Sequence, residues 1–422
     1  MARGGLPTRP QAARMLLAMA VSLMAHRAGA QVVDFDTTHT IFYEAPTLTH
    51  MFVYSPAVTL SATPWEWLSV NAGWEADVVS GASVAIKAGP AYQANHPGAD
   101  VVTTASVHDF RNSAIAGFTL RKDAVSFSAG YNYSTEHDYR SNSFNLAART
   151  ETYEHNTQFE LDYAHNFDQV CNRVQAATDN SPTLYHALEN SVGCFTNSNP
   201  LRTTDDLAID SLQASWSQSW TPVFQTQAVA SLQVVDGFQS NPYRSVVISN
   251  GVEAQENVPD LRIREAIALR AHFFLRPIKG ALRFMARLYE DSWDITSGTG
   301  EAEFEKYLGE SFRVTLRGRL YVQSGAIFWS DDYTGGSAPL GPRGSYWTGD
   351  RELSPFWSWS LGIRPVYTLS SPRGRLLKVM TSLKFGASFD VVNPTYEQFT
   401  LGGVPIGGAH QLIGQLSLTA LF

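Results

Sequence analysis

Arginines recur at alternate positions in several neighbouring stretches of the second half of the chain. Between residues 261 and 276, arginine and histidine alternate with aliphatic and aromatic residues, and glutamates alternate with other residues between 301 and 305. Such alternation places the charged side chains on one face of a β-strand. Facing lipid, each charge would cost about 2–4 kcal/mol at mid-membrane depth, so we expect these residues to face a lumen. The expected lumen-lining residues are Arg264, Arg270, His272, Arg283, Arg287, Glu303, Glu305, Arg313, Arg317 and Arg319.

Two interpretations of this charged face compete. An arginine-lined wall would give a channel a preference for anionic solutes. Alternatively, arginine and glutamate on neighbouring strands would form cross-strand ladders that only brace the wall. The adjacency of the glutamates and the arginines favours bracing. Other expected inner faces are polar and uncharged, for example the alternating serine and glutamine residues between 211 and 217.

Acidic residues gather where strands are expected to meet long loops, as at Glu75 and Asp77 or at Glu290 and Asp291. Hard cations such as Ca²⁺ take several such oxygen ligands. No loop signature with fixed ligand spacing is present, so a solvated acidic rim is the favoured interpretation. We predict no metal and no other cofactor.

The sequence lacks the local signatures of common enzymes. It contains no G-x-S-x-G, H-E-x-x-H or C-x-x-C motif, and these motifs carry the nucleophiles and metal ligands of hydrolases, metalloproteases and redox proteins. We therefore predict that the protein is not an enzyme and name no catalytic residue. The formal net charge of -8 argues against nucleic acid as a partner.

The first thirty residues have the composition of a cleaved signal peptide. Basic residues precede a short apolar run, and the small residues Ala28, Gly29 and Ala30 come before Gln31. Export implies an oxidising compartment, where the two cysteines, Cys171 and Cys194, are expected to form a disulfide. Two free thiols are the alternative.

Period-two alternation dominates the rest of the chain, residues 31–422, in segments typical of transmembrane β-strands. Short connections alternate with long ones, which we expect at 80–108, 168–206, 239–260, 330–350 and 391–409. We predict an all-β fold, a single antiparallel up-and-down transmembrane β-barrel of about sixteen strands, with fourteen also compatible. The short turns would be periplasmic and the long loops extracellular. The expected strands are 33–43, 49–62, 66–78, 109–121, 124–136, 139–150, 156–167, 207–219, 223–238, 261–276, 280–294, 297–308, 312–329, 351–368, 375–390 and 410–422.

The last strand ends the chain on an aromatic residue. Leu412, Leu416 and Leu418 share one face, and the polar residues between them share the other. A half-apolar strand ending on an aromatic carboxy terminus, here Phe422, resembles the assembly signal of Gram-negative outer-membrane barrels. The expected partners are therefore outer-membrane lipid and the barrel-assembly machinery, and the expected location is the outer membrane of a Gram-negative bacterium.

Five short motifs follow one another along the chain: DVVSGAS at 77–83, GYNYSTEHDYRS at 130–141, NPYR at 241–244, YEDSWD at 289–294 and QSGA at 323–326. In this order they resemble the domain-of-unknown-function-3570 family of predicted outer-membrane proteins. The resemblance implies a fold and a location but no activity. It makes the motif residues at strand ends candidates for a shared rim feature, namely Asp77, Glu136, Asp138, Tyr243, Arg244, Asp291 and Asp294.

A channel is the function that these patterns favour. A barrel of this size with a polar inner face would be a porin-like channel for small polar solutes. The alternative is a structural or binding barrel plugged by its loops, such as 80–108 or 168–206, and serving a surface or periplasmic partner. An enzyme on the barrel would need a serine and a histidine within hydrogen-bond reach.

Overall fold

The computed structural model describes residues 32–45, 51–88, 99–172, 193–195, 202–241, 245–248, 252–331, 333, 345–370, 376, 379–401, 404–408 and 410–422. The expected signal peptide and the rim candidates Tyr243 and Arg244 lie outside these ranges. None of the helices in the described ranges is long and apolar enough to cross a membrane.

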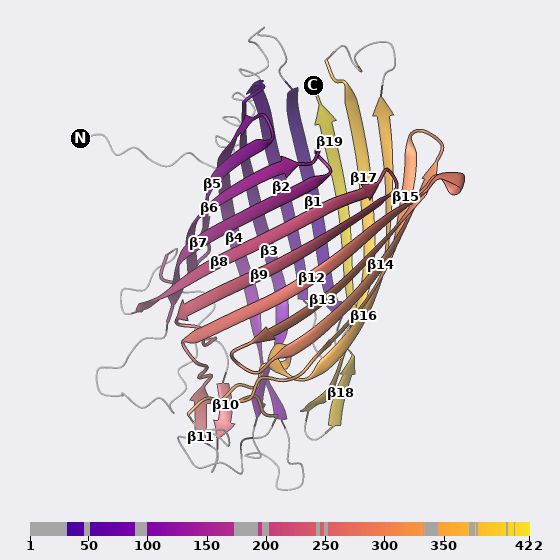
Figure 1. The fold of residues 1–422 in the computed structure, drawn as a ribbon. Helices are drawn as coiled ribbons and strands as arrows, with labels where there is room; N and C mark the ends of the chain where they lie inside the picture. The colour runs from indigo at the N-terminus through magenta and orange to yellow at the C-terminus, as the bar shows by residue number, and fades with distance from the viewer. Residues whose placement is uncertain are drawn as a thin grey trace, which may run out of the picture.

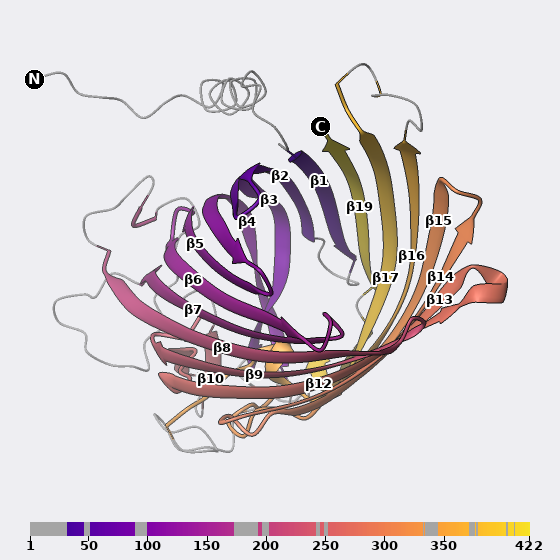
Figure 2. The same ribbon diagram turned by 45° about the horizontal axis from the view of Figure 1, so that its top comes forward.

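The chain folds into a closed antiparallel β-barrel of sixteen strands, as the sequence predicts (Figures 1 and 2). Consecutive strands pair with each other, and the first strand, β1, pairs with both β2 and the last strand, β19, which closes the barrel. The barrel strands are β1 (Val32–Ala45), β2 (Met51–Trp65), β3 (Leu68–Ala88), β4 (Ala99–Lys122), β5 (Val125–Thr135), β6 (Tyr139–Thr152), β7 (Thr157–Cys171), β8 (Thr204–Thr221), β9 (Phe224–Gly237), β12 (Leu261–Leu275), β13 (Gly280–Asp291), β14 (Thr296–Leu308), β15 (Phe312–Gln323), β16 (Phe356–Ser370), β17 (Ser382–Leu401) and β19 (His410–Leu421).

Smaller elements lie in the connections. The pair β10 (Ser245–Ile248) and β11 (Val252–Gln255) follows β9, and β18 (Val404–Gly408) pairs with the end of β17. The 3-10 helix η1 (Arg276–Ile278) joins β12 to β13, and η2 (Arg351–Leu353) precedes β16. In Figure 1 the chain ends at the upper rim, and β10, β11 and β18 lie at the lower rim. The upper rim carries the short turns, and the lower rim carries most of the long connections.

In two of the expected loops, strands of the barrel continue well beyond their expected ends. The ladder between β3 and β4 continues through Ser80↔His108 to Ala88↔Ala99, inside the range expected as a loop. This range is rich in valine, threonine and isoleucine, which favour extended backbone. Similarly, β17 continues to Leu401 and forms a hairpin with β18 inside the range 391–409. Both hairpins therefore extend beyond the expected ends of their strands.

Several strand boundaries also differ from the expected ones. The strand expected over 375–390 begins at Ser382, and the strand expected over 280–294 ends at Asp291. The strand expected over 312–329 ends at Gln323, because the residues after it turn away and pack Ala326 and Phe328 into a buried cluster. The strand expected from 351 begins at Phe356, since residues 351–353 form η2 instead. At Ala326 and Phe328, the free energy of burying apolar side chains outweighs that of continuing the ladder.

The strands separate apolar from polar side chains across the barrel wall. On β19, Leu412, Leu416 and Leu418 pair with outward residues of β1, and Leu416 is 63% exposed. On the inner side, the amide of Gln415 donates to the hydroxyl of Thr40 at 3.1 Å. The last strand thus turns its leucines outward and its polar residues towards the lumen, as the alternation predicts.

A charge placed on either face of β19 tests this assignment. Leu416→Arg puts a guanidinium in the middle of the outer face, and we expect it to lower the free energy of unfolding in lipid by about 2–4 kcal/mol. Gln415→Arg, one residue away and facing the lumen, is expected to change it by less than about 0.5 kcal/mol. Urea unfolding in phospholipid vesicles measures both variants. Equal losses would contradict the assignment of the two faces.

Candidate functional site

The predicted charged face lines one wall of the lumen. Cross-strand pairing places Arg270 opposite Gln227 and Met285, His272 opposite Arg283, and Arg317 opposite Glu303. The apolar residues between them, such as Leu269 and Leu320, are exposed on the outer face. By register, all ten residues that the sequence places on the lumen side share one face of β12, β13, β14 and β15, opposite the exposed apolar side chains.

Three glutamates of β14 join the arginines on both sides of them. Arg283 on β13 contacts Glu303 at 3.3 Å and Glu305 at 3.2 Å. On the other side, Arg317 of β15 contacts Glu301 at 2.6 Å. Arg313 and Arg364 complete the ladder, at 3.5 Å from Glu305 and 3.6 Å from Glu303. This part of the wall has the cross-strand bracing that the sequence favours.

Four further arginines on the wall formed by β12, β13 and β15 have no carboxylate within 4 Å among the described residues. Arg264 donates to Gln233 at 2.8 Å, and Arg270 donates to Gln227 at 2.9 Å. Arg287 lies over the ring of Tyr289, 5.2 Å from its centroid, and Arg319 lies 6.0 Å from that of Tyr321. The same wall therefore contains a brace of ion pairs and four uncompensated positive charges.

A second ion-pair cluster lies on the wall formed by β3 and β4. Arg111 contacts Asp77 at 2.6 Å and Glu75 at 2.8 Å, and Ser55 donates to Asp77. Asp77 is therefore a lumen-wall residue rather than the rim residue that the sequence suggests. The reason is that β3 continues beyond it to Ala88. Sequence reasoning missed Arg111, although the alternation of Glu75 and Asp77 on one strand could have indicated a cationic partner on the next.

The other described rim candidates belong to two separate hairpins. Glu136 and Asp138 flank the turn between β5 and β6, and Asp291 and Asp294 flank the turn between β13 and β14. Asp138 lies 3.7 Å from the ring of His137. Across the described ranges, no group of three or more acidic, histidine or cysteine side chains is arranged to hold a metal ion.

Asp291 is the centre of a buried network at the lower rim, where most of the long connections lie; this end of the lumen is called the mouth. Its side chain is 0% exposed and accepts hydrogen bonds from Arg262 at 2.9 Å and from Tyr289 at 2.7 Å. It also accepts from the backbone amides of Trp293 and Ile295, at 2.9 and 3.1 Å. The Arg262 guanidinium lies 4.1 Å above the Trp293 ring. Asp291 thus fixes the turn between β13 and β14 against β12.

Two described parts of the connection between β15 and β16, residues 324–331 and 345–355, pack against other connections and the lumen wall. Ala326 and Phe328 pack with Val258, Trp293 and Ile295 in a buried cluster. Lumen-facing Gln323 donates from its side-chain amide to the backbone carbonyls of Glu352 and Ser354, at 2.9 and 2.8 Å. Tertiary packing therefore holds η2 inside the mouth.

An ion pair fixes η2 to the strands that close the barrel. Arg351 donates to Glu44 of β1 at 2.6 Å, and Gln411 of β19 donates to the same carboxylate at 2.9 Å. Glu44 is only 3% exposed. Burial lowers the pKa of Arg351, but Tyr396, Glu44 and Glu352 together outweigh burial and hold that pKa above its ordinary value. The guanidinium is therefore charged at every physiological pH.

Two further elements reach across the mouth. β10 contacts β3, and the end of β17 contacts β4, although neither pair is adjacent in the barrel. Figure 1 shows β10, β11 and β18 gathered at the lower rim, next to the ends of β3 and β4. The long-loop end is thus narrowed by packed chain from several sides.

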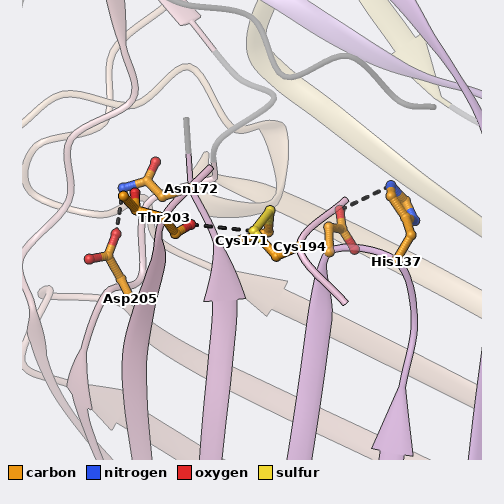
Figure 3. Close-up of a disulfide and its surroundings, with 7 residues drawn as sticks. His137, Cys171, Asn172, Cys194, Thr203 and Asp205 are labelled. Carbon is orange, nitrogen blue, oxygen red and sulfur yellow. Dashed lines mark hydrogen bonds and ion pairs between the residues drawn. A yellow bond between two sulfur atoms is a disulfide. The ribbon is translucent and has the colours of Figure 1, made fainter. Parts of the chain in front are cut away.

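A disulfide ties the loop after β7 to the barrel (Figure 3). Cys171, the last residue of β7, is bonded to Cys194, with their Cα atoms 5.6 Å apart. The backbone amides of Cys194 and Phe195 both donate to the carbonyl of His137, at 2.9 and 3.1 Å. A Cβ on Gly193 would lie 1.9 Å from that carbonyl oxygen, so only glycine fits there. The returning segment therefore rests against the turn between β5 and β6.

Removing this disulfide should loosen the loop and spare the barrel. The bond closes a loop of 23 residues, for which the chain-entropy estimate is about 3 kcal/mol. We expect Cys194→Ser to increase cleavage between β7 and β8 in limited proteolysis, because the loop loses its covalent link to β7. The barrel strands should stay resistant, since their own ladders are unchanged. Wild type reduced with dithiothreitol is the control and should be cleaved in the same way. Resistance of the variant equal to that of oxidised wild type would contradict this.

The outer wall carries a polar cluster that sequence reasoning missed. Asp210 of β8 accepts from Tyr163 of β7 at 2.6 Å and lies 2.7 Å from the ring of His165. Phe144 and Phe167 pack against the histidine. The period-two pattern puts all three polar residues on the outer face, but their contacts depend on the register between β7 and β8.

Comparison with known proteins identifies the family to which the chain belongs. The family model described as "Protein of unknown function (DUF3570)" matches residues 11–373. The chain belongs to this family. The match confirms the resemblance drawn from the strand-end motifs. The DUF3570 description states no activity, and no curated protein matches the chain.

Solved barrels resemble this member of the DUF3570 family only distantly. A bacterial polysaccharide outer membrane secretin gives a TM-score of 0.48 at 10% identity, over 93% of this chain and 98% of that chain. OprB of Pseudomonas putida gives 0.43 at 7% identity, over 93% and 94%. OccD3 (OpdP) of Pseudomonas aeruginosa gives 0.42 at 8% identity, over 94% and 92%. At such scores we transfer no property from them.

Proposed function

We propose that the protein is an outer-membrane channel for small polar solutes that prefers anions, a passive and non-catalytic role. The observation that carries the proposal is the division of the wall. Large apolar side chains such as Leu288, Leu320 and Leu361 are exposed outside, and hydrogen-bonded polar and charged side chains lie inside. An apolar band around a closed barrel suits a bilayer, and sixteen strands enclose an aqueous lumen.

The preference for anions rests on Arg264, Arg270, Arg287 and Arg319. Their charges are not balanced by carboxylates, unlike those of the bracing ladder, so they raise the local concentration of anions in the lumen. In this proposal, the ion-paired arginines brace the wall, and the four arginines without a carboxylate partner select for anions.

A second candidate function has its own supporting observation. β10 contacts β3 and η2 is fixed to Glu44, so packed chain lies at the mouth. A barrel closed in this way would be a structural or binding protein at the cell surface.

Ion conductance in planar lipid bilayers separates the two functions. The purified, folded protein is expected to give discrete openings in KCl, and the reversal potential in a salt gradient should show chloride more permeant than potassium. Heat-denatured protein is the control. A folded barrel that gives no openings at any voltage would overturn the channel and favour the closed binding barrel.

We also propose that β19 carries the signal for the barrel-assembly machinery. In the folded barrel Phe422 forms one ladder bond, from its amide to the carbonyl of Val33 at 3.0 Å. Deleting Phe422 should therefore lower the amount of folded protein in the outer membrane several-fold, while purified protein still refolds in detergent. Heat-modifiable migration in gels measures both, and Phe422→Tyr is the control. Wild-type levels of the truncated protein in outer-membrane fractions would refute the signal.

A further inference from the structure

A pocket of 520 Å³ opens into the lumen beneath η2, between β15, β16, β17 and β19. Pockets that hold small molecules have about 300–1,000 Å³. Glu352 of η2 borders the pocket on the mouth side, and inward residues of the four strands form its floor and sides. A solute that enters through the mouth would pass this pocket just inside the lumen.

The pocket has an aromatic floor, and Val392, Pro394 and Ile413 add further apolar surface to its lining. The ring centroids of Tyr321 and Phe356 are 5.4 Å apart, and Tyr396 supports Phe356 from behind at 5.0 Å. The Tyr321 hydroxyl donates to Gln323 at 2.6 Å, and the Tyr396 hydroxyl donates to Glu352 at 3.3 Å. Since both hydroxyls are engaged and Tyr396 is buried, the pocket presents the half-buried rings of Tyr321 and Phe356. Such rings offer a large apolar surface against which the ring of a ligand can pack.

One uncompensated cation stands beside this floor. The Arg319 guanidinium, two residues before Tyr321 on the same strand, has no carboxylate within 4 Å in the described part of the chain. The other two arginines of the pocket already have carboxylate partners, because Arg317 lies 2.6 Å from Glu301 and 3.8 Å from Asp390, and Arg364 lies 3.6 Å from Glu303. Glu352 is likewise balanced by Arg351, at 3.3 Å. Arg319 is therefore free to pair with an anionic group of a ligand.

We propose that this pocket is a binding subsite for a small organic acid that contains one ring. The ring lies on Tyr321 and Phe356, and the carboxylate pairs with Arg319. This inference rests on the proposed channel, in which the subsite would concentrate one class of solute just inside the mouth. A carboxylate without a ring would make no contact with the aromatic floor, and a neutral ring compound would form no ion pair with the guanidinium.

Three probes dissect the subsite in planar bilayers: cyclohexanecarboxylate has ring and charge, acetate has charge alone, and cyclohexanol has a ring alone. We expect only cyclohexanecarboxylate to interrupt the single-channel current in a concentration-dependent way. Arg319→Gln should raise its half-blocking concentration about tenfold or more, as for loss of a hydrogen bond to a charged group. Tyr321→Leu should raise it several-fold.

Arg121 provides the matched control. It is a lumen arginine of β4, hydrogen-bonded to Ser69 at 2.8 Å and lying on another part of the wall. Arg121→Gln removes one positive lumen charge as Arg319→Gln does, yet it should leave the half-blocking concentration unchanged. Equal effects of the two variants would overturn the subsite, as would equal block by acetate.

Failure of the subsite and failure of the channel give different results. A barrel that conducts but shows no specific block by cyclohexanecarboxylate keeps the channel and overturns the subsite. For a barrel that does not conduct, calorimetric titration of the detergent-solubilised protein with cyclohexanecarboxylate tests the subsite alone. Saturable heat that is lost in Arg319→Gln and kept in Arg121→Gln supports it, and no saturable heat in wild type overturns it.

Discussion

Asp291→Asn is expected to destabilise the barrel by about 3–5 kcal/mol, the usual cost of breaking a buried ion pair by removing one partner. Asp291 has no exposed surface and Arg262 is only 10% exposed, so water cannot replace the lost carboxylate. The amide keeps a single acceptor oxygen for Arg262, Tyr289 and two backbone amides, and leaves the guanidinium charge unpaired. Urea unfolding in vesicles measures the loss of stability.

Asp294→Asn is the matched control, three residues further along the same hairpin. It also removes one carboxylate, and the left-handed backbone of Asp294, with φ at 64°, suits asparagine as well as aspartate. The expected change is within about 0.5 kcal/mol. A similar, small change in both variants would show that the Asp291 network does not hold the mouth together.

Neutralising the four uncompensated arginines is expected to abolish the anion preference of the channel. In the quadruple variant, with Arg264, Arg270, Arg287 and Arg319 each changed to Gln, the ratio of chloride to potassium permeability should fall several-fold. Carboxylates elsewhere on the wall, such as Glu160 and Asp162, keep their charges, so the preference should move towards cations. The reversal potential in a KCl gradient measures this shift.

The control for this experiment removes one braced ion pair. Glu301→Gln combined with Arg317→Gln takes away one negative and one positive lumen charge and leaves the net charge unchanged. We expect the permeability ratio to stay close to that of wild type. If the double variant shifts the ratio as far as the quadruple variant does, the uncompensated arginines are not the source of selectivity.

The mouth shows most clearly what local patterns could not predict. The residues from Ser324 to Trp329 continue the alternation of β15, and the sequence predicts a strand through them. In the structure, Ala326 and Phe328 leave the wall because they can be buried against Val258 and Trp293. Those partners come from two other connections, so no local window contains the information.

The rim candidates show the same limit. The motif that includes Asp291 and Asp294 marks a real strand end, but only one of its two aspartates is buried. Asp77 also belongs to a motif, yet it lies on the lumen wall with Arg111, because β3 continues past it. Residue type and motif position give no measure of burial, which depends on the chain that folds over them.

The amino-acid sequence by itself determined the class of fold, a barrel of about sixteen strands with fourteen still compatible, and the face of the strand that the charged residues of β12 to β15 and the polar residues of β19 share. These follow from period-two alternation, a property of consecutive residues. Only the tertiary structure decided which arginines are paired. Arg317 contacts Glu301, and Arg319 has no carboxylate within 4 Å among the residues that the structure describes, because pairing depends on register and stagger between strands. The inward fold of η2 onto Glu44, more than 300 residues away in the chain, likewise follows from closure of the barrel by β1 and β19.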